Sequence, residues 1–169
     1  LRAIAALRRH STHAHLTIAA RAAVAPMFAM VRGIDALVTL PGGGGLKAVN
    51  GWKEDAQALQ PGGFDLAILL PNSFATALIA KNAAIAERWG FATDWRGRLL
   101  TRPIAKPKDA AHQADYYQAL TSALGIERGP QFAEVRPNAE RTRELMIDIG
   151  LEPDEKFVVF APGAAYGRA

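Results

Sequence analysis

The chain alternates between short uninterrupted apolar runs and longer segments in which apolar residues recur every three or four positions. The clearest apolar run is Leu66–Leu70, which is typical of a strand buried on both faces of a parallel sheet. Pro71 ends it, because proline cannot donate to a sheet ladder. Asn72 and Ser73 are both good N-cap residues for the alanine-rich helix that we predict over residues 74–85.

The same alternation extends along the rest of the chain. It predicts further strands over residues 15–20, 34–40 and 89–92, and helices over residues 1–9, 21–31, 46–59 and 112–124. Ala114, Tyr117, Leu120 and Leu124 form the expected buried stripe of the last helix. Residues 93–107 are expected to be irregular. Strands separated by helices at this spacing favour an α/β fold built from βαβ units with right-handed crossovers.

Three segments are expected in the domain organisation. Residues 1–136 form a first lobe, residues 137–155 form a connector between Pro137 and Pro153, and residues 156–169 open a second lobe with a buried strand over 157–161. The connector should hold a helix capped by Asn138, with Leu145, Met146 and Ile149 facing inward. Because the chain starts inside a helical pattern and stops inside a glycine-containing loop, we expect it to be truncated at both ends.

Composition narrows the function classes only modestly. The 169 residues contain no cysteine, which excludes disulfides and thiolate chemistry, and they carry a net charge of +4. This charge favours anionic partners but is too small to indicate nucleic acid. No apolar run approaches the ~20 residues of a membrane-spanning helix.

Between residues 88 and 108 the chain carries six basic side chains and one acidic one; we call this stretch the basic segment. Its basic residues are Arg88, Arg96, Arg98, Arg102, Lys106 and Lys108. Trp89 and Trp95 lie among them. One interpretation is a site for anions and sugars, since arginine binds phosphate or carboxylate in a bidentate manner and tryptophan stacks on sugar rings. The other is a solvated basic loop.

Two other patterns favour no special chemistry. Four consecutive glycines at residues 42–45 lack the Gly-Lys-Ser/Thr ending of a phosphate-binding loop, so we interpret them as a surface loop. His10, His13 and His15 lie close together without a neighbouring carboxylate or cysteine, and we expect solvated histidines and no metal site.

Three stretches in order resemble the family-9 glycosyltransferases, most closely the ADP-heptose:lipopolysaccharide heptosyltransferase II group. They are Phe64–Phe74 with its Leu-Pro-Asn-Ser-Phe sequence, Thr93–Arg98, and the Pro-Gly-Ala-Ala-Tyr-Gly loop within Ala161–Ala169. Asp94 replaces the family's usual glycine before Trp95-Arg96-Gly97. The resemblance extends over most of the chain and includes a helix around residues 112–125.

The resemblance implies a GT-B architecture, with this chain as the Rossmann-like acceptor-binding lobe plus the first strand and loop of the donor-binding lobe. It implies acceptor contacts from Asn72, Ser73, Trp95, Arg96 and Arg98. It also implies donor-phosphate contacts from the loop residues Gly163, Ala164, Ala165, Tyr166 and Gly167. The family's general base, an aspartate, would precede Leu1, so we assign no catalytic residue here.

The activity implied by the resemblance is metal-independent transfer of heptose from ADP-heptose to the anionic inner core of lipopolysaccharide, without a cofactor. It implies a cytoplasmic enzyme, with contact at the cytoplasmic face of the inner membrane left open. The 169 residues alone are expected to be inactive. Two alternatives remain open at this point: a non-catalytic Rossmann-like module that binds a sugar or nucleotide, and a family-9 enzyme with another activated sugar.

Overall fold

The computed structural model describes residues 1–42, 48–107, 113–130, 134–152 and 155–160. The chain divides into two compact units, residues 1–136 and residues 137–169. All of the strands found in the described part of the chain belong to the first unit.

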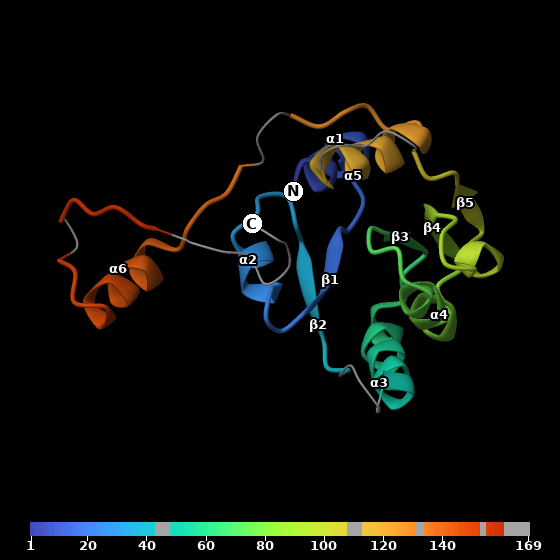
Figure 1. Ribbon diagram of the computed structural model, residues 1–169, viewed down its shortest axis with the longest axis horizontal. Helices are drawn as coiled ribbons and strands as arrows, with labels where there is room; N and C mark the ends of the chain where they lie inside the picture. The colour runs from blue at the N-terminus through green and yellow to red at the C-terminus, as the bar shows by residue number, and fades with distance from the viewer. Residues whose placement is uncertain (43–47, 108–112, 131–133, 153–154, 161–169) are drawn as a thin grey trace. The chain divides into compact units, whose positions relative to one another are not determined.

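Two parallel sheets form the centre of the first unit (Figure 1). In one sheet β1 (Thr17–Arg21) pairs with β2 (Ala36–Leu40), with Thr17 opposite Ala36. The other sheet has the order β3 (Leu66–Leu69), β4 (Glu87–Phe91), β5 (Arg102–Ile104). Parallel pairing between successive strands requires a crossover between them, so the predicted βαβ organisation is confirmed.

The helices form two layers around the strands. The helices of the first unit are α1 (Arg2–His10), α2 (Ala25–Ala29), α3 (Ala48–Leu59), α4 (Phe74–Asn82) and α5 (Gln113–Ala123), with short 3₁₀ helices η2 (Gln60–Gly62) and η3 (Arg96–Leu99). One apolar cluster joins α1 and α5 to the β3–β5 sheet. A second cluster joins α3 and α4 to β2 and β3.

β3 contributes to both clusters because its side chains alternate between the two faces of the sheet. Ile68 packs against the cluster of α1 and α5, whereas Ala67 and Leu69 pack against the cluster of α3 and α4. The prediction that helices cover both faces of β3 is therefore confirmed, but the prediction that the strand is fully buried is wrong. Leu66 is 38% exposed, and the strand is only half-buried elsewhere. The reason is that β3 lies at an edge of its sheet in the described part of the chain.

Two predictions of local structure are corrected. The helix expected over residues 21–31 is reduced to the five residues of α2, because residue 21 completes β1 and a turn follows it. Residues 93–107 are not uniformly irregular, since they contain η3 and β5. The strand β5 is defined by its pairing with β4, in which Pro103 lies opposite Gly90. Its three residues are too few to show a recognisable period in the sequence.

The buried face of α5 also differs from the predicted stripe. Leu120 is fully buried and Leu124 is 6% exposed, as expected, but Tyr116 is buried where we predicted Tyr117, which is half-buried. Tyr116 packs against Phe91 with their ring centroids 4.6 Å apart. The stripe therefore follows a spacing of four residues through positions 116, 120 and 124.

A buried carboxylate joins the ends of β1 and β2 to α3. Asp55 of α3 has no exposed surface, and its Oδ1 accepts hydrogen bonds from the Gly42 N–H and from Arg21 Nη1, each at 2.8 Å. Its Oδ2 lies 2.6 Å from Arg21 Nη2 without the alignment of a hydrogen bond. A side chain at Gly42 would place its Cβ 2.2 Å from the Gly51 carbonyl oxygen. The approach of β2 to α3 thus requires glycine at position 42.

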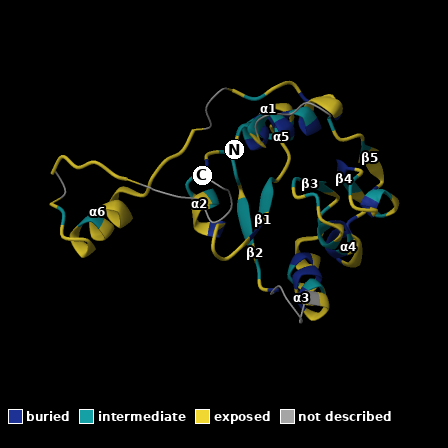
Figure 2. Ribbon diagram, in the orientation of Figure 1, coloured by how far each residue is buried: buried dark blue, intermediate teal, exposed yellow. Residues whose placement is uncertain are grey.

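The second unit contains α6 (Ala139–Asp148). Its predicted cap is confirmed, because Asn138 Oδ1 accepts a hydrogen bond from the Arg141 N–H at 2.9 Å. The predicted inward face is wrong: Leu145 is 46% exposed and Ile149 is 70% exposed, and Met146 is half-buried (Figure 2). The amphipathic pattern is present, but the described residues of this unit supply no second layer to cover it.

The strand predicted over residues 157–161 is likewise absent from its described part, residues 157–160. Phe157, Val158, Val159 and Phe160 are between 50% and 86% exposed. An apolar run becomes a strand only when a neighbour accepts and donates its main-chain hydrogen bonds. No such neighbour lies within the described residues of this unit, so the local signal alone does not produce a strand.

Candidate functional site

The turn that follows β3 is the centre of the candidate site. Ser73 caps α4, as predicted, since its Oγ accepts a hydrogen bond from the Thr76 N–H at 3.4 Å. Thr76 Oγ1 donates in turn to the Ser73 carbonyl oxygen at 2.8 Å. Pro71 and Ser73 are exposed and Asn72 is half-buried. The sequence therefore places a polar turn at the carboxyl end of a parallel strand and at a helix N-terminus, where open α/β folds bind ligands.

Arg96 lies beneath this turn and is fully buried. Its Nε donates to the Phe91 carbonyl oxygen at 2.8 Å, and its Nη1 donates to the carbonyl oxygen of Pro71 and to Thr76 Oγ1, the latter at 3.2 Å. Burial lowers the pKa of this guanidinium from its usual value, partly offset by Tyr116 and Asp94. We predicted a direct contact between Arg96 and the acceptor. In this structure the guanidinium is buried and forms hydrogen bonds to groups of the protein itself.

Asn72 is held at three atoms. Its Nδ2 donates to Tyr116 Oη at 2.6 Å, its Oδ1 lies 3.5 Å from Arg96 Nη2, and its carbonyl oxygen accepts a hydrogen bond from Thr93 Oγ1 at 3.0 Å. The turn is consequently tied to the loop after β4 and to α5. A polar group fixed in this way is prepared for binding, because little conformational freedom is lost when a ligand docks.

Trp95 lies on the outer side of the same loop and is 91% exposed. Asp94 and Trp95 both have left-handed backbone conformations, with φ of 48° and 61°. Such conformations cost a residue with a side chain about 1 kcal/mol or more, and they occur often at binding sites. Arg98, one turn further on, is exposed. Trp95 and Arg98 are therefore accessible to a ligand, in contrast to Arg96.

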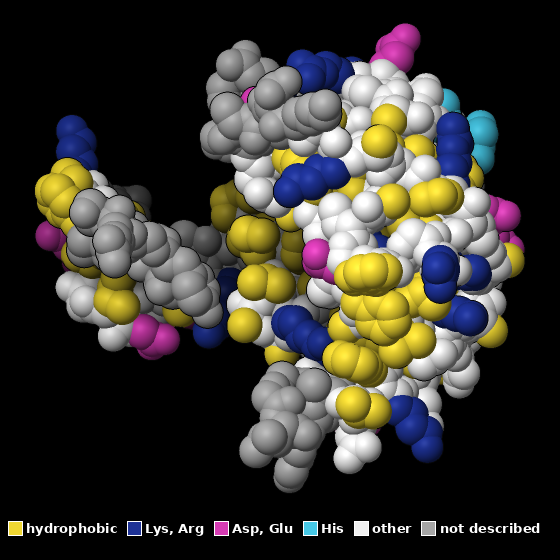
Figure 3. All heavy atoms as spheres, turned by 45° about the vertical axis from the view of Figure 1, so that its right-hand side comes forward, with side chains coloured by type: hydrophobic (Ala, Val, Ile, Leu, Met, Phe, Trp, Pro, Cys, Tyr) yellow, Lys and Arg dark blue, Asp and Glu magenta, His cyan; other side chains and the backbone are white. Residues whose placement is uncertain are grey.

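The other described members of the basic segment contact different parts of the first unit. Arg88 donates to the Leu99 carbonyl oxygen at 2.8 Å, Arg102 lies 5.0 Å from the centre of the Trp89 ring, and Lys106 lies 5.9 Å from that of Tyr116. Lys108 falls outside the described residues. On the face drawn in Figure 3, Lys and Arg side chains lie at several separate places. The segment is therefore not a uniformly solvated loop, and its role in binding anions and sugars stays a prediction.

The predicted donor-phosphate residues lie outside the described part of the chain. They are Gly163, Ala164, Ala165, Tyr166 and Gly167.

The three clustered histidines, His10, His13 and His15, are exposed. Within the described ranges, no group of three or more His, Cys, Asp or Glu side chains could hold a metal ion. No helix there has the length and apolar character needed to cross a membrane.

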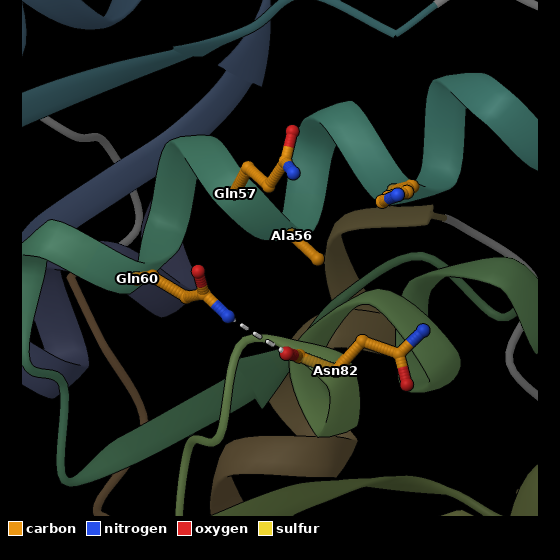
Figure 4. Close-up of a pocket in the computed structure, with 5 residues that line it drawn as sticks. Ala56, Gln57, Gln60 and Asn82 are labelled. Carbon is orange, nitrogen blue, oxygen red and sulfur yellow. Dashed lines mark hydrogen bonds between the residues drawn. The ribbon is translucent and has the colours of Figure 1, made fainter.

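A pocket of about 400 Å³ lies elsewhere, between α3 and α4 (Figure 4). Its lining residues are Lys53, Ala56, Gln57, Gln60 and Asn82. Gln60 Nε2 donates to the Asn82 carbonyl oxygen across it at 3.3 Å. Asn82 is the last residue of α4, whereas the polar turn precedes the first residue of that helix. The pocket is thus at the opposite end of α4 from the candidate site, and we assign it no function.

Sequence reasoning missed two residues of the site, Tyr116 and Thr93. Tyr116 could have been found from its spacing of four residues from Leu120, since both side chains must then face the core. Thr93 carries no such signal, because its hydrogen bond to Asn72 spans 21 positions of the chain. Only the tertiary structure brings these two residues to the turn.

Sequence comparison relates the chain to known glycosyltransferases. Residues 53–169 match the family model of Glycosyltransferase family 9 (heptosyltransferase). The chain is 27% identical over 171 residues to lipopolysaccharide heptosyltransferase 2 of Salmonella typhimurium, covering 96% of this chain and 49% of that protein. It is 24% identical over 152 residues to the Escherichia coli K12 protein of the same name, covering 85% of this chain and 44% of that one.

Solved structures show the fold independently. The E. coli ADP-heptose lps heptosyltransferase II structure superposes with a TM-score of 0.69 at 19% identity, covering 89% of this chain and 46% of that chain. A glycosyl transferase family 9 structure from Veillonella parvula has a TM-score of 0.74 at 18% identity, covering 90% and 45%. The described fold is that of a Rossmann-like lobe of a GT-B enzyme. The chain spans about half the length of the curated relatives it matches.

Proposed function

The chain belongs to glycosyltransferase family 9, and from this membership we propose that the whole protein transfers heptose from ADP-heptose to the inner core of lipopolysaccharide. The observation that carries the proposal is the alignment over 96% of the chain with a lipopolysaccharide heptosyltransferase 2. The polar turn at the carboxyl end of β3 supports it, because this is where an α/β lobe binds a substrate.

In this proposal residues 1–136 are the acceptor-binding lobe, and a strand preceding Leu1 completes its sheet. The free edges support the second point: β1 pairs only with β2, and β3 pairs only with β4, in the described part of the chain. Parallel sheets are normally continuous and covered on both faces, and an unpaired edge leaves main-chain groups without partners. Residues 137–155 would then connect the two lobes, and residues 156–169 would open the donor-binding lobe.

We assign the acceptor contacts to Asn72, Ser73, Trp95 and Arg98. The inner core of lipopolysaccharide carries carboxylates and phosphates, so a helix N-terminus and an exposed guanidinium provide complementary groups. Trp95 offers an apolar face on which a sugar ring can stack. The donor pyrophosphate is assigned to residues 163–167, where small residues permit close approach of the backbone to a phosphate.

The proposal also includes metal-independent catalysis without a cofactor, and action in the cytoplasm on an acceptor presented at the inner membrane. To test metal independence, the transfer rate is measured with and without EDTA, and we expect it to be unchanged. Loss of activity with EDTA and its return with one divalent ion would contradict metal-independent catalysis.

To test the location, cells are lysed and fractionated. The whole protein should appear in the cytosolic and peripheral inner-membrane fractions.

The decisive experiment measures transfer directly. The whole protein is incubated with ADP-heptose and lipopolysaccharide whose core lacks heptose, and the product is examined by mass spectrometry for the added heptose mass. Reactions with a different ADP-sugar, and with the 169 residues alone, serve as comparisons. We expect transfer only with ADP-heptose and the whole protein. Binding of ADP-heptose without transfer would favour a non-catalytic module, and transfer from another sugar donor would favour a different family-9 specificity.

Replacement of Trp95 with alanine, or of Arg98 with glutamine, tests the accessible acceptor contacts. Each variant is expected to raise the KM for the acceptor by about fivefold to tenfold, because stacking and charged hydrogen bonds at exposed sites contribute about 1 kcal/mol each. The KM for the donor should stay the same. Arg128→Gln, which removes an exposed arginine outside the turn, is a matched control. Acceptor kinetics equal to those of the unmodified protein would remove these two residues from the site.

A further inference from the structure

Arg96 is a buried cation that forms no close ion pair and is bound by neutral polar groups of the protein. No described carboxylate lies within 4.0 Å of its guanidinium nitrogens. Its partners are the carbonyl oxygens of Leu69, Pro71, Ser73 and Phe91, the Thr76 hydroxyl and the Asn72 carboxamide. An arginine needed only to fill space in a core would be replaceable by an apolar side chain at lower cost in desolvation. Its polar contacts are therefore its distinguishing feature.

These contacts come from separate parts of the first unit and meet at the turn after β3. Phe91 ends β4, Leu69 ends β3, and Thr76 lies in the first turn of α4. The planar guanidinium carries five N–H donors in a fixed arrangement, so it can bridge several carbonyl oxygens at once. A lysine ammonium is a single nitrogen with three donors on a flexible stem, so it cannot bridge carbonyl oxygens as far apart as a guanidinium can.

Arg96 also selects one orientation of the Asn72 carboxamide. A guanidinium can only donate, so the atom that faces it must be the amide oxygen. The amide nitrogen is then directed to Tyr116 Oη, which accepts its hydrogen bond at 2.6 Å. A flipped carboxamide would place its NH₂ group against the guanidinium, donor to donor. The two neighbours thus define which hydrogen-bonding groups of Asn72 remain for a ligand.

We propose that Arg96 is a positioning residue of the acceptor site: its guanidinium holds the turn at residues 71–73 and, with Tyr116, orients the Asn72 carboxamide for the acceptor. Arg96 itself does not contact the acceptor. This inference rests on the proposed function, because it takes the turn as the place where the acceptor binds. This positioning role takes the place of the direct acceptor contact that the family resemblance implied for Arg96.

The kinetic test uses Arg96→Lys and Tyr116→Phe in the whole protein, with heptose transfer measured over a range of acceptor and donor concentrations. We expect Arg96→Lys to raise the KM for the acceptor at least tenfold, with the KM for ADP-heptose unchanged within twofold. Tyr116→Phe keeps the ring in the core and removes one anchor of the carboxamide, so a smaller rise of about threefold to fivefold is expected. A purely structural role would lower the active fraction and leave both KM values unchanged.

Arg88→Lys is the matched control. Arg88 is a half-buried arginine that also donates to carbonyl oxygens, those of Ile85, Ala86 and Leu99, but it lies near the amino end of β4. The Arg88→Lys substitution should lower the melting temperature without changing the KM for the acceptor. An equal rise in acceptor KM in Arg88→Lys and Arg96→Lys would overturn the proposal, since general destabilisation would then explain both.

The side-chain amide signals of Asn72 in a ¹⁵N-labelled sample give a readout that does not depend on catalysis. Both Arg96→Lys and Tyr116→Phe should shift these signals, whereas Arg88→Lys should not. Unchanged Asn72 signals in folded Arg96→Lys and Tyr116→Phe samples would overturn the positioning role. If the unmodified protein transfers no heptose, the proposed function fails, and the amide signals still decide whether Arg96 and Tyr116 hold Asn72.

Discussion

Alanine in place of Asp55 is expected to lower the free energy of unfolding by about 3 kcal/mol, because loss of one partner from a buried ion pair leaves uncompensated polar groups. The affected groups are the buried Gly42 N–H and the Arg21 guanidinium, both now bonded to Asp55 Oδ1 at 2.8 Å. Arg21 is 44% exposed and can still reach water, so the expected loss is at the lower end for such pairs. Urea denaturation monitored by circular dichroism measures the difference.

Two comparisons separate the effect of the buried carboxylate from other causes. Asp55→Asn keeps an oxygen that can accept from the Gly42 N–H but removes the charge, so it should lower the free energy of unfolding by only about 1–2 kcal/mol. Glu54→Ala removes the exposed acidic neighbour on the same helix and should change it by less than about 0.5 kcal/mol. If Asp55→Ala and Glu54→Ala gave equal values, the joint between β1, β2 and α3 would not depend on Asp55.

Leu120→Ala is the second substitution with a large expected effect. Leu120 has no exposed surface and belongs to the apolar cluster formed by α1, α5 and the β3–β5 sheet. Removal of its three terminal carbons from a closely packed core should lower the free energy of unfolding by about 2–5 kcal/mol. For a chain of this length, a loss of about 3 kcal/mol corresponds to a fall in melting temperature of roughly 6–12 °C.

Leu145→Ala is a matched control, because the same side chain is shortened where it is 46% exposed on α6. Its expected change in free energy is below about 0.5 kcal/mol. A comparable loss for the two leucines would mean that α6 is covered in the whole protein, or that α5 is not the helix on which the core depends. Hydrogen exchange of the α5 amides distinguishes these two explanations.

The position of the candidate site was predictable from local patterns. Pro71 after an apolar run marks the end of β3, and Ser73 caps α4 through its own side chain. Both are short-range effects, because a proline blocks a ladder hydrogen bond and a serine satisfies an N–H three residues away. The family assignment followed from residues 64–74, 93–98 and 161–169 taken together and was confirmed by the family model.

Individual roles were less predictable, because a side chain's burial depends on distant parts of the chain. Arg96 and Arg98 are equal in type and two residues apart, yet one is fully buried and the other exposed. The difference arises because the carbonyl oxygens that bind Arg96 come from the ends of β3 and β4, up to 27 residues away. No local pattern records that convergence.

The sequence by itself determined the alternation of helices and strands from α1 to β4, the polar turn at residues 71–73 and membership of the family. Each of these depends on neighbours within a few residues or on similarity along the chain. The tertiary structure alone decided that Arg96 supports the turn from within, that Tyr116 and not Tyr117 joins it, and that residues 157–160 stay exposed in their unit. The physical reason is common to all three: burial and hydrogen bonding require partners that the chain supplies only by folding.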